Sequence, residues 1–210
     1  MLDAYSAEEL WHMDPMIKGH DAQFISNINI SPSLAKRLKN TVDKAKTIDS
    51  VTVYPGDTPG PNNLIAWMKK DNNQYGYTKE NTSYQQTEYI NKEVELENLA
   101  QQLKLNNYYF ILNKLPPGRF LPWHFDTYHR LRQTPLTLGE IKDLKKKNNI
   151  RRYIVFLEDW HWGHFLQIGN DVVANWHAGD MYTWDPFRFH LAVNAGIKYR
   201  YTLTITGLIA

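Results

Sequence analysis

The stretch LNKLPPGRFLPWHFDTYHR, residues 112–130, places a Pro-Pro-Gly turn between an apolar run and a run that ends in histidine and aspartate. These turn residues predict that the chain reverses direction here, between two β-strands. Alternate side chains of a strand share a face, so His124 and Asp126 are predicted to point into one space. An imidazole and a carboxylate on one face are two candidate ligands for a metal ion.

Short aromatic and β-branched runs continue from residue 107 to the end of the chain, separated by turn residues. This pattern is typical of an antiparallel sandwich or barrel. Eight runs qualify as strands, a number that suits a jelly roll: 108–114, 120–126, 151–158, 164–169, 171–176, 180–184, 187–193 and 199–207. We therefore predict a mainly β fold, a cupin-like double-stranded β-helix, over residues 106–210.

Residues 1–105 have a different texture and are predicted to form mostly helical support within the same single domain, 1–210. One helix is expected over 31–46, with Ser31 as N-cap and Pro32 at the first helical position. A second is expected over 87–105, where apolar residues recur at near-helical spacing. Two further segments are expected between elements: a Pro- and Gly-rich loop at 51–63 and a helical insertion at 137–149.

Composition limits the classes of function. The 210 residues include 24 basic and 22 acidic side chains, a formal charge of +2, which is too small to argue for a nucleic-acid or membrane partner. No apolar run reaches the roughly 20 residues that span a bilayer, and the N-terminus lacks a secretory pattern, so a cytoplasmic protein is expected. The chain has no cysteine, so a bound metal must be held by histidine and carboxylate side chains. Nothing in the composition indicates an oligomeric state.

His190 is the best candidate for a third metal ligand. It lies on another predicted strand, whose opposite face carries the apolar residues Leu191 and Val193. Two histidines and one carboxylate on one side of a metal form the facial triad of non-haem Fe(II) oxygenases, which leaves positions open for a cosubstrate and oxygen. His124, Asp126 and His190 are therefore the predicted metal and catalytic residues.

Arg200 strengthens this hypothesis. The segment NAGIK, residues 194–198, is a tight-turn sequence, and a hairpin there predicts that His190 and Arg200 lie opposite each other on adjacent strands. A guanidinium suits a carboxylate, and a dicarboxylate held by the metal at one end would supply one. Thr202, on the same face as Arg200, adds a hydroxyl donor. A structural ion pair is the alternative role for Arg200.

Four segments together carry a resemblance to a known family: 110–126, 151–159, 166–196 and 198–207. They resemble the catalytic core of the aspartyl/asparaginyl β-hydroxylase-like family of 2-oxoglutarate- and Fe(II)-dependent oxygenases. The resemblance implies that His124 and His190 bind iron and that Arg200 binds the distal carboxylate of 2-oxoglutarate. It also places Asn113 and Tyr153 at cosubstrate-contacting positions and Arg151 at a substrate-facing position, which the neighbouring Arg152 takes if the alignment shifts by one residue.

One departure from that family concerns Asp126, where its animal members have glycine. The complete triad is more like that of prolyl and free-amino-acid hydroxylases. We therefore expect a dioxygenase that uses O2 to hydroxylate an amino-acid side chain, in a protein or peptide or in a free amino acid. Trp123, Tyr128 and Trp184 are among the aromatic residues expected to wall the substrate pocket.

Two other classes of function remain open. A non-enzymatic, cupin-like protein that binds a metal or small molecule would not need Arg200 beside the metal. A nucleic-acid demethylase of the same chemistry is suggested by RYTLTITG, residues 200–207, which resembles the ending of those enzymes. Their second arginine, six residues after the first, falls at Thr206, and the balanced charge also counts against nucleic acid as a partner.

Overall fold

A computed structural model of the chain describes residues 21–45, 47–49, 84–90, 93–124, 126, 128, 149–186, 188 and 190–209. The side chains of residues 47–49, 84–86 and 122–124 lie outside that description. The loop predicted at 51–63 and nearly all of the helical insertion predicted at 137–149 lie outside the described residues as well.

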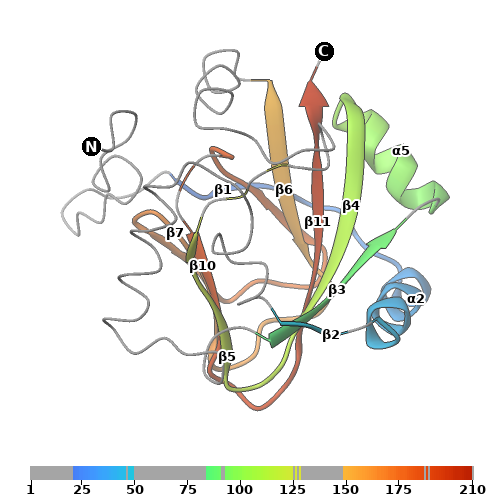
Figure 1. Ribbon diagram of the computed structural model, residues 1–210. Coiled ribbons are helices and arrows are strands. Elements are labelled where there is room, and N and C mark those ends of the chain that lie inside the picture. Colours follow the sequence, from blue (N-terminus) through green and yellow to red (C-terminus); the bar gives the residue numbers. More distant parts are fainter. Residues whose placement is uncertain are drawn as a thin grey trace.

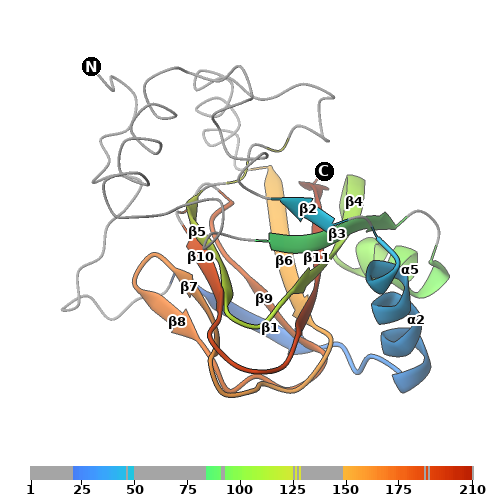
Figure 2. The same cartoon turned by 60° about the horizontal axis from the view of Figure 1, so that its bottom comes forward.

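The described strands form two sheets that face each other (Figures 1 and 2). The larger sheet contains seven strands: β1 (Gln23–Asn27), β2 (Thr47–Asp49), β3 (Tyr84–Ile90), β4 (Leu105–Leu115), β6 (Ile150–Phe156), β9 (Asp180–Thr183) and β11 (Arg200–Ile209). The smaller sheet contains four: β5 (Arg119–His124), β7 (His164–Ile168), β8 (Asp171–Val173) and β10 (His190–Asn194). Their orders are β1-β9-β6-β11-β4-β3-β2 and β5-β10-β7-β8.

The eight strands from β4 to β11 are a jelly roll. The chain crosses between the two sheets along this sequence, and every described strand pair is antiparallel. All eight strands predicted from the sequence are present, so the predicted mainly β, double-stranded β-helix fold is confirmed.

The N-terminal half differs from the expectation of mostly helical support, because its described part also contributes strands β1, β2 and β3 to the larger sheet. The helix predicted over 87–105 is α5 and spans only Val94–Gln102. Residues 87–90 instead belong to β3, which pairs with β4 from Gln86 opposite Lys114 to Ile90 opposite Phe110. Thr87, Tyr89 and Ile90 are strand-favouring residues, and pairing with β4 outweighed the helical spacing.

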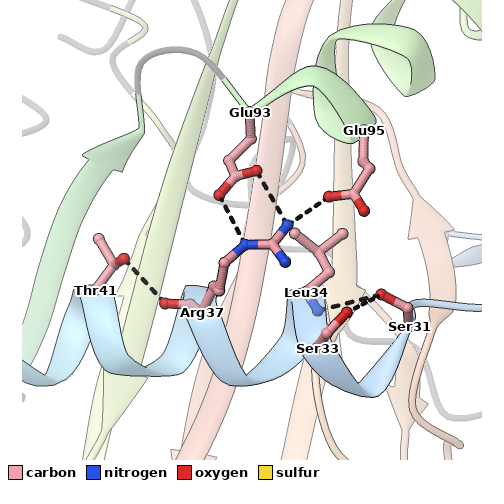
Figure 3. Close-up of polar contacts among 7 residues, drawn as sticks. All are labelled: Ser31, Ser33, Leu34, Arg37, Thr41, Glu93 and Glu95. Atoms are coloured by element: carbon pink, nitrogen blue, oxygen red, sulfur yellow. Dashed lines mark hydrogen bonds and ion pairs between the residues drawn. The ribbon is translucent and has the colours of Figure 1, made fainter.

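The first predicted helix is confirmed as α2, Pro32–Asp43, with Ser31 as its N-cap. The Ser31 hydroxyl accepts a hydrogen bond from the backbone N–H of Leu34 at 3.2 Å, satisfying one of the donors that a helix start leaves open (Figure 3). Arg37 of α2 contacts Glu93 and Glu95 at the start of α5, the latter at 2.7 Å, and so links the two helices (Figure 3). None of the described helices is long and apolar enough to cross a membrane.

The two faces of the larger sheet pack against different partners. Its outer face packs against α2 and α5, with Leu38, Leu96, Val155 and Leu203 among the buried residues (Figure 1). Its inner face looks toward the smaller sheet and encloses a second cluster that includes Phe156, Ile168, Trp176 and Trp184. This interior between the sheets contains the candidate site.

Candidate active site

Asp126 and His190 converge at one end of the barrel interior. His190 is the first residue of β10, and its Nε2 lies 3.5 Å from Asp126 Oδ2. Both side chains are largely buried, with 6% and 19% of their surface exposed. His190 Nδ1 lies 3.0 Å from the carbonyl oxygen of Arg188, to which it donates, and Nε2 is the ring nitrogen that faces the carboxylate. This is the second-shell arrangement that metal-binding histidines commonly have.

The backbone of β5 brings His124 to the same place. His124 is the strand partner of His190 in the β5–β10 ladder, and the register shifts between His190 and Ala192 at a bulge. Its side chain lies outside the described residues. Among the described side chains, no three histidine or carboxylate groups gather to hold a metal, so the third ligand remains a prediction.

Arg152 of β6 is the cationic neighbour of Asp126. Its Nε lies 2.8 Å from Asp126 Oδ2, the same oxygen that faces His190. Its Nη1 donates to the hydroxyl of Thr206 at 3.1 Å. Burial, the largest single influence, lowers the pKa of the Arg152 guanidinium, but the charge of Asp126 together with smaller contributions from nearby tyrosines outweighs it, so the pKa lies above its ordinary value. Arg152 is therefore positively charged at this position.

Aromatic rings close this end of the barrel. The Arg152 guanidinium lies 5.9 Å from the ring centres of both Tyr128 and Trp184, and the Trp184 ring lies 5.3 Å from that of His190. The Tyr128 hydroxyl donates to the carbonyl of Pro186, and burial raises the Tyr128 pKa well above its ordinary value. Tyr128 and Trp184 therefore form part of the buried surroundings of Arg152 and His190.

Arg200 lies on the inner face of β11, opposite Leu115 of β4. It is buried, and its guanidinium carbon lies 5.7 Å from the ring centres of Phe156 and Trp176. Burial lowers its pKa to about 10, so the group is charged at neutral pH. Within the described part of the chain, no hydrogen-bond acceptor reaches Arg200 Nε or Nη2. A buried charge of this kind is costly until an anion pairs with it.

A row of hydroxyl and amide groups continues along the inner face from Arg200. Thr202, Thr204 and Thr206 alternate on β11, and all three are buried. Asn113, opposite Thr202, donates to the Thr204 hydroxyl at 3.3 Å and accepts from the Thr87 hydroxyl at 3.1 Å. A polar row therefore runs along the inner face of β11 from Arg200 to Thr206, where it meets Arg152.

Two sequence-based placements are wrong. His190 and Arg200 do not lie on adjacent strands: β10 belongs to the smaller sheet, and the neighbours of β11 are β4 and β6. Tyr153 packs in the outer cluster beside the helices, on the face opposite Arg152, so it does not reach the interior as a cosubstrate contact. Arg151 lies on the same face of β6 as Tyr153, and its Nη1 donates to the carbonyl of Ile150. The side chain of Trp123 lies outside the described residues.

Sequence reasoning did not identify Arg152 as the partner of Asp126. Shifting a strand assignment by one residue exchanges its two faces. The sequence of β6 does not indicate which of its faces points into the barrel. Ile154 and Phe156 on one face and Val155 on the other are all buried and apolar. A strand buried on both faces has no polar alternation to read.

Comparisons with known proteins found only distant similarities. Among solved structures, a viral collagen prolyl hydroxylase from Paramecium Bursaria Chlorella virus-1, in complex with 2OG, is 9% identical, with 91% of this chain and 97% of that chain covered and a TM-score of 0.48. A Pseudomonas putida prolyl-4-hydroxylase is 14% identical, covers 91% and 94%, and has a TM-score of 0.47. A cupin domain from Bordetella pertussis is 12% identical, covers 59% and 92%, and has a TM-score of 0.35.

No protein-family model matches the chain, and no curated protein matches it. At such low identities, the similarity to the solved structures concerns the fold alone. Any conclusion about function must come from the residues of the site.

The described residues fit a divalent cation and a dicarboxylate. A histidine nitrogen and a carboxylate oxygen 3.5 Å apart are suitable donors for one cation. The two nitrogens of Arg200 that meet no acceptor in the described part of the chain are suitable donors for an anion that enters the same interior.

Proposed function

We propose that the chain is an Fe(II)- and 2-oxoglutarate-dependent dioxygenase that hydroxylates an amino-acid side chain, in a protein or peptide or in a free amino acid. The observation that carries the proposal is the buried guanidinium of Arg200, two of whose nitrogens meet no acceptor among the described residues, in the same barrel interior as the converging His190 and Asp126. A metal site alone would explain only the histidine and the carboxylate. A dicarboxylate cosubstrate also explains why the charge of Arg200 is kept.

In this proposal, His190, Asp126 and His124 hold the iron. Arg200 receives the distal carboxylate of 2-oxoglutarate, and the hydroxyl of Thr202 and the amide of Asn113 line its binding site. When bound, iron and 2-oxoglutarate supply the oxidising chemistry, in which O2 is consumed, succinate and carbon dioxide are released and a C–H bond of the substrate is hydroxylated.

The protein's own contribution is orientation and exclusion of water. The carbonyl of Arg188 fixes the tautomer and the ring orientation of His190. Tyr128 and Trp184 keep the interior dry, which strengthens each electrostatic contact made there. The substrate would approach at the end of the barrel where His190 and Asp126 lie, because the C–H bond that is hydroxylated has to reach the iron held there.

The test is production of succinate from 2-oxoglutarate by the purified protein with Fe(II) in air, with a peptide library and a set of free amino acids as substrates. Succinate formation should fall by more than about a hundredfold in His190→Ala. His161→Ala, in the turn before β7, is the matched control and should retain wild-type turnover. Equal succinate formation by wild type and His190→Ala would contradict the proposed function.

A further inference from the structure

Asp126 faces two competing partners. Its Oδ2 lies 2.8 Å from Arg152 Nε and 3.5 Å from His190 Nε2. A cation bound by His190 and Asp126 therefore has to share the carboxylate with a guanidinium. A facial triad needs only its three ligands, so the proposed function leaves Arg152 without a role.

The position of Arg152 is fixed by several contacts. Its Nη1 donates to Thr206, its backbone carbonyl accepts from the hydroxyl of Thr183 at 2.7 Å, and the ring centres of Tyr128 and Trp184 each lie 5.9 Å from its guanidinium. Only 11% of its side-chain surface is exposed. The guanidinium therefore cannot simply swing into solvent when a cation binds.

The charges at the site then decide what binds. The guanidinium satisfies the charge of Asp126 in the absence of a metal, and it repels a divalent cation placed beside that carboxylate. This repulsion is strong because the site is buried and weakly screened. With a cation bound, Arg152 and Arg200 leave an excess of positive charge in the interior, which a dicarboxylate would reduce.

On this basis, and resting on the proposed function, we propose that Arg152 is a built-in counter-ion of Asp126 that weakens binding of a divalent cation alone and makes cation binding depend on a dicarboxylate. Arg152 is thus a positioning residue. It acts on the cation through Asp126. Through that contact it makes the affinity for the cation depend on whether the dicarboxylate is bound.

The experiment measures Mn(II) affinity by electron paramagnetic resonance of the unbound ion, with and without 2-oxoglutarate. Arg152→Gln should bind Mn(II) alone about tenfold more tightly than wild type, because the competing charge is gone. The tightening produced by 2-oxoglutarate should be smaller in this variant than in wild type. Arg152→Lys keeps the charge and should stay within about threefold of wild type.

Arg151→Gln is the matched control. It removes the same charge from the neighbouring position on the opposite face of β6, and its Mn(II) affinity should equal that of wild type. Because Arg152→Gln leaves Asp126 without its partner, circular dichroism checks folding. A second measurement needs no variant: glutarate, a dicarboxylate without the chelating keto group, should also tighten Mn(II) binding by wild type.

The outcomes separate this inference from the proposed function. If Mn(II) binding depends on His190 but is no tighter in Arg152→Gln than in wild type, or if glutarate has no effect on wild type, the counter-ion role is wrong and the proposed function stands. If Mn(II) binding is absent, or is unchanged in His190→Ala, both fail.

Discussion

The two faces of β11 are equally buried and chemically opposite. Toward the helices, Leu203 and Ile205 pack in an apolar cluster with α2 and α5. Toward the smaller sheet, the same strand carries Arg200 and the threonines 202, 204 and 206. Burial by itself therefore does not say which face stabilises the fold.

The difference shows how this chain separates stability from function. Apolar burial favours folding, whereas polar groups held away from water contribute little net stability even when they are hydrogen-bonded. Arg200 is the extreme case, since two of its nitrogens find no acceptor among the described residues. A buried group of this kind on the inner face is explained if a bound ligand accepts hydrogen bonds from those nitrogens.

The largest expected effect is a loss of stability from a substitution in the apolar cluster on the outer face of the larger sheet. Leu203 is fully buried between its strand partners Leu112 and Val155. Leu203→Ala should lower the free energy of unfolding by about 3 kcal/mol because it removes apolar contacts and leaves a cavity. Urea denaturation followed by circular dichroism measures the loss. The affinity of the folded variant for 2-oxoglutarate should stay at the wild-type value. A parallel loss of affinity would mean that the outer face also contributes to ligand binding.

Replacing Arg200 should have the opposite pattern. Arg200→Met removes a buried charge and keeps most of the side-chain volume, so the unliganded protein should be as stable as wild type or more stable by about 1 kcal/mol. Thermal unfolding without ligand measures this. In the presence of Fe(II), anaerobically, the rise in Tm that 2-oxoglutarate gives to wild type should be absent from the variant. A strongly destabilised variant would mean that Arg200 is structural.

Thr204→Val tests the polar row at a smaller scale. The variant keeps the shape of the side chain but removes the hydroxyl that accepts from Asn113. The free energy of unfolding should change by no more than about 1 kcal/mol, the net value of one hydrogen bond. Urea denaturation of Thr204→Val and Thr204→Ser provides the comparison, and a loss as large as that of Leu203→Ala would show that the inner face also holds the fold.

The smallest expected effect is a pH dependence at His164, the first residue of β7. Burial lowers its pKa below the ordinary value, and the nearby charge of Arg200 lowers it further. The unfolded chain therefore binds a proton more readily than the folded one, so stability should decrease as the pH falls below about 6.5. The decrease should be shallower in His164→Gln, as measured by Tm between neutral and mildly acidic pH.

Much of the fold was predictable because the signals were local. Turn residues and β-branched runs fixed the eight core strands, and Ser31 with Pro32 fixed the start of α2. Asp126 and His190 were chosen as candidate metal ligands from residue type and strand face, and their side chains lie 3.5 Å apart. These inferences needed only the immediate neighbours of each residue in the sequence.

The errors came from long-range pairing and strand parity. The turn at 194–198 was correctly located, but the strands it joins separate into different sheets, a fact that no local signal carries. Residues 87–90, which were predicted to begin a helix, belong to strand β3 because they pair with β4. On β6, one residue of parity decides whether Arg151 or Arg152 reaches Asp126, and both faces of that strand are buried.

The central claim is that the barrel interior holds iron and a dicarboxylate, with Arg200 at the far end of the latter. Its most direct test is an anaerobic titration of wild type and Arg200→Met with Fe(II) and 2-oxoglutarate, following the visible charge-transfer band of the iron-bound keto acid. The account predicts a band in wild type that Arg200→Met gives weakly or only at far higher 2-oxoglutarate concentration. Iron binding with no band, or equal titrations of both proteins, would contradict it.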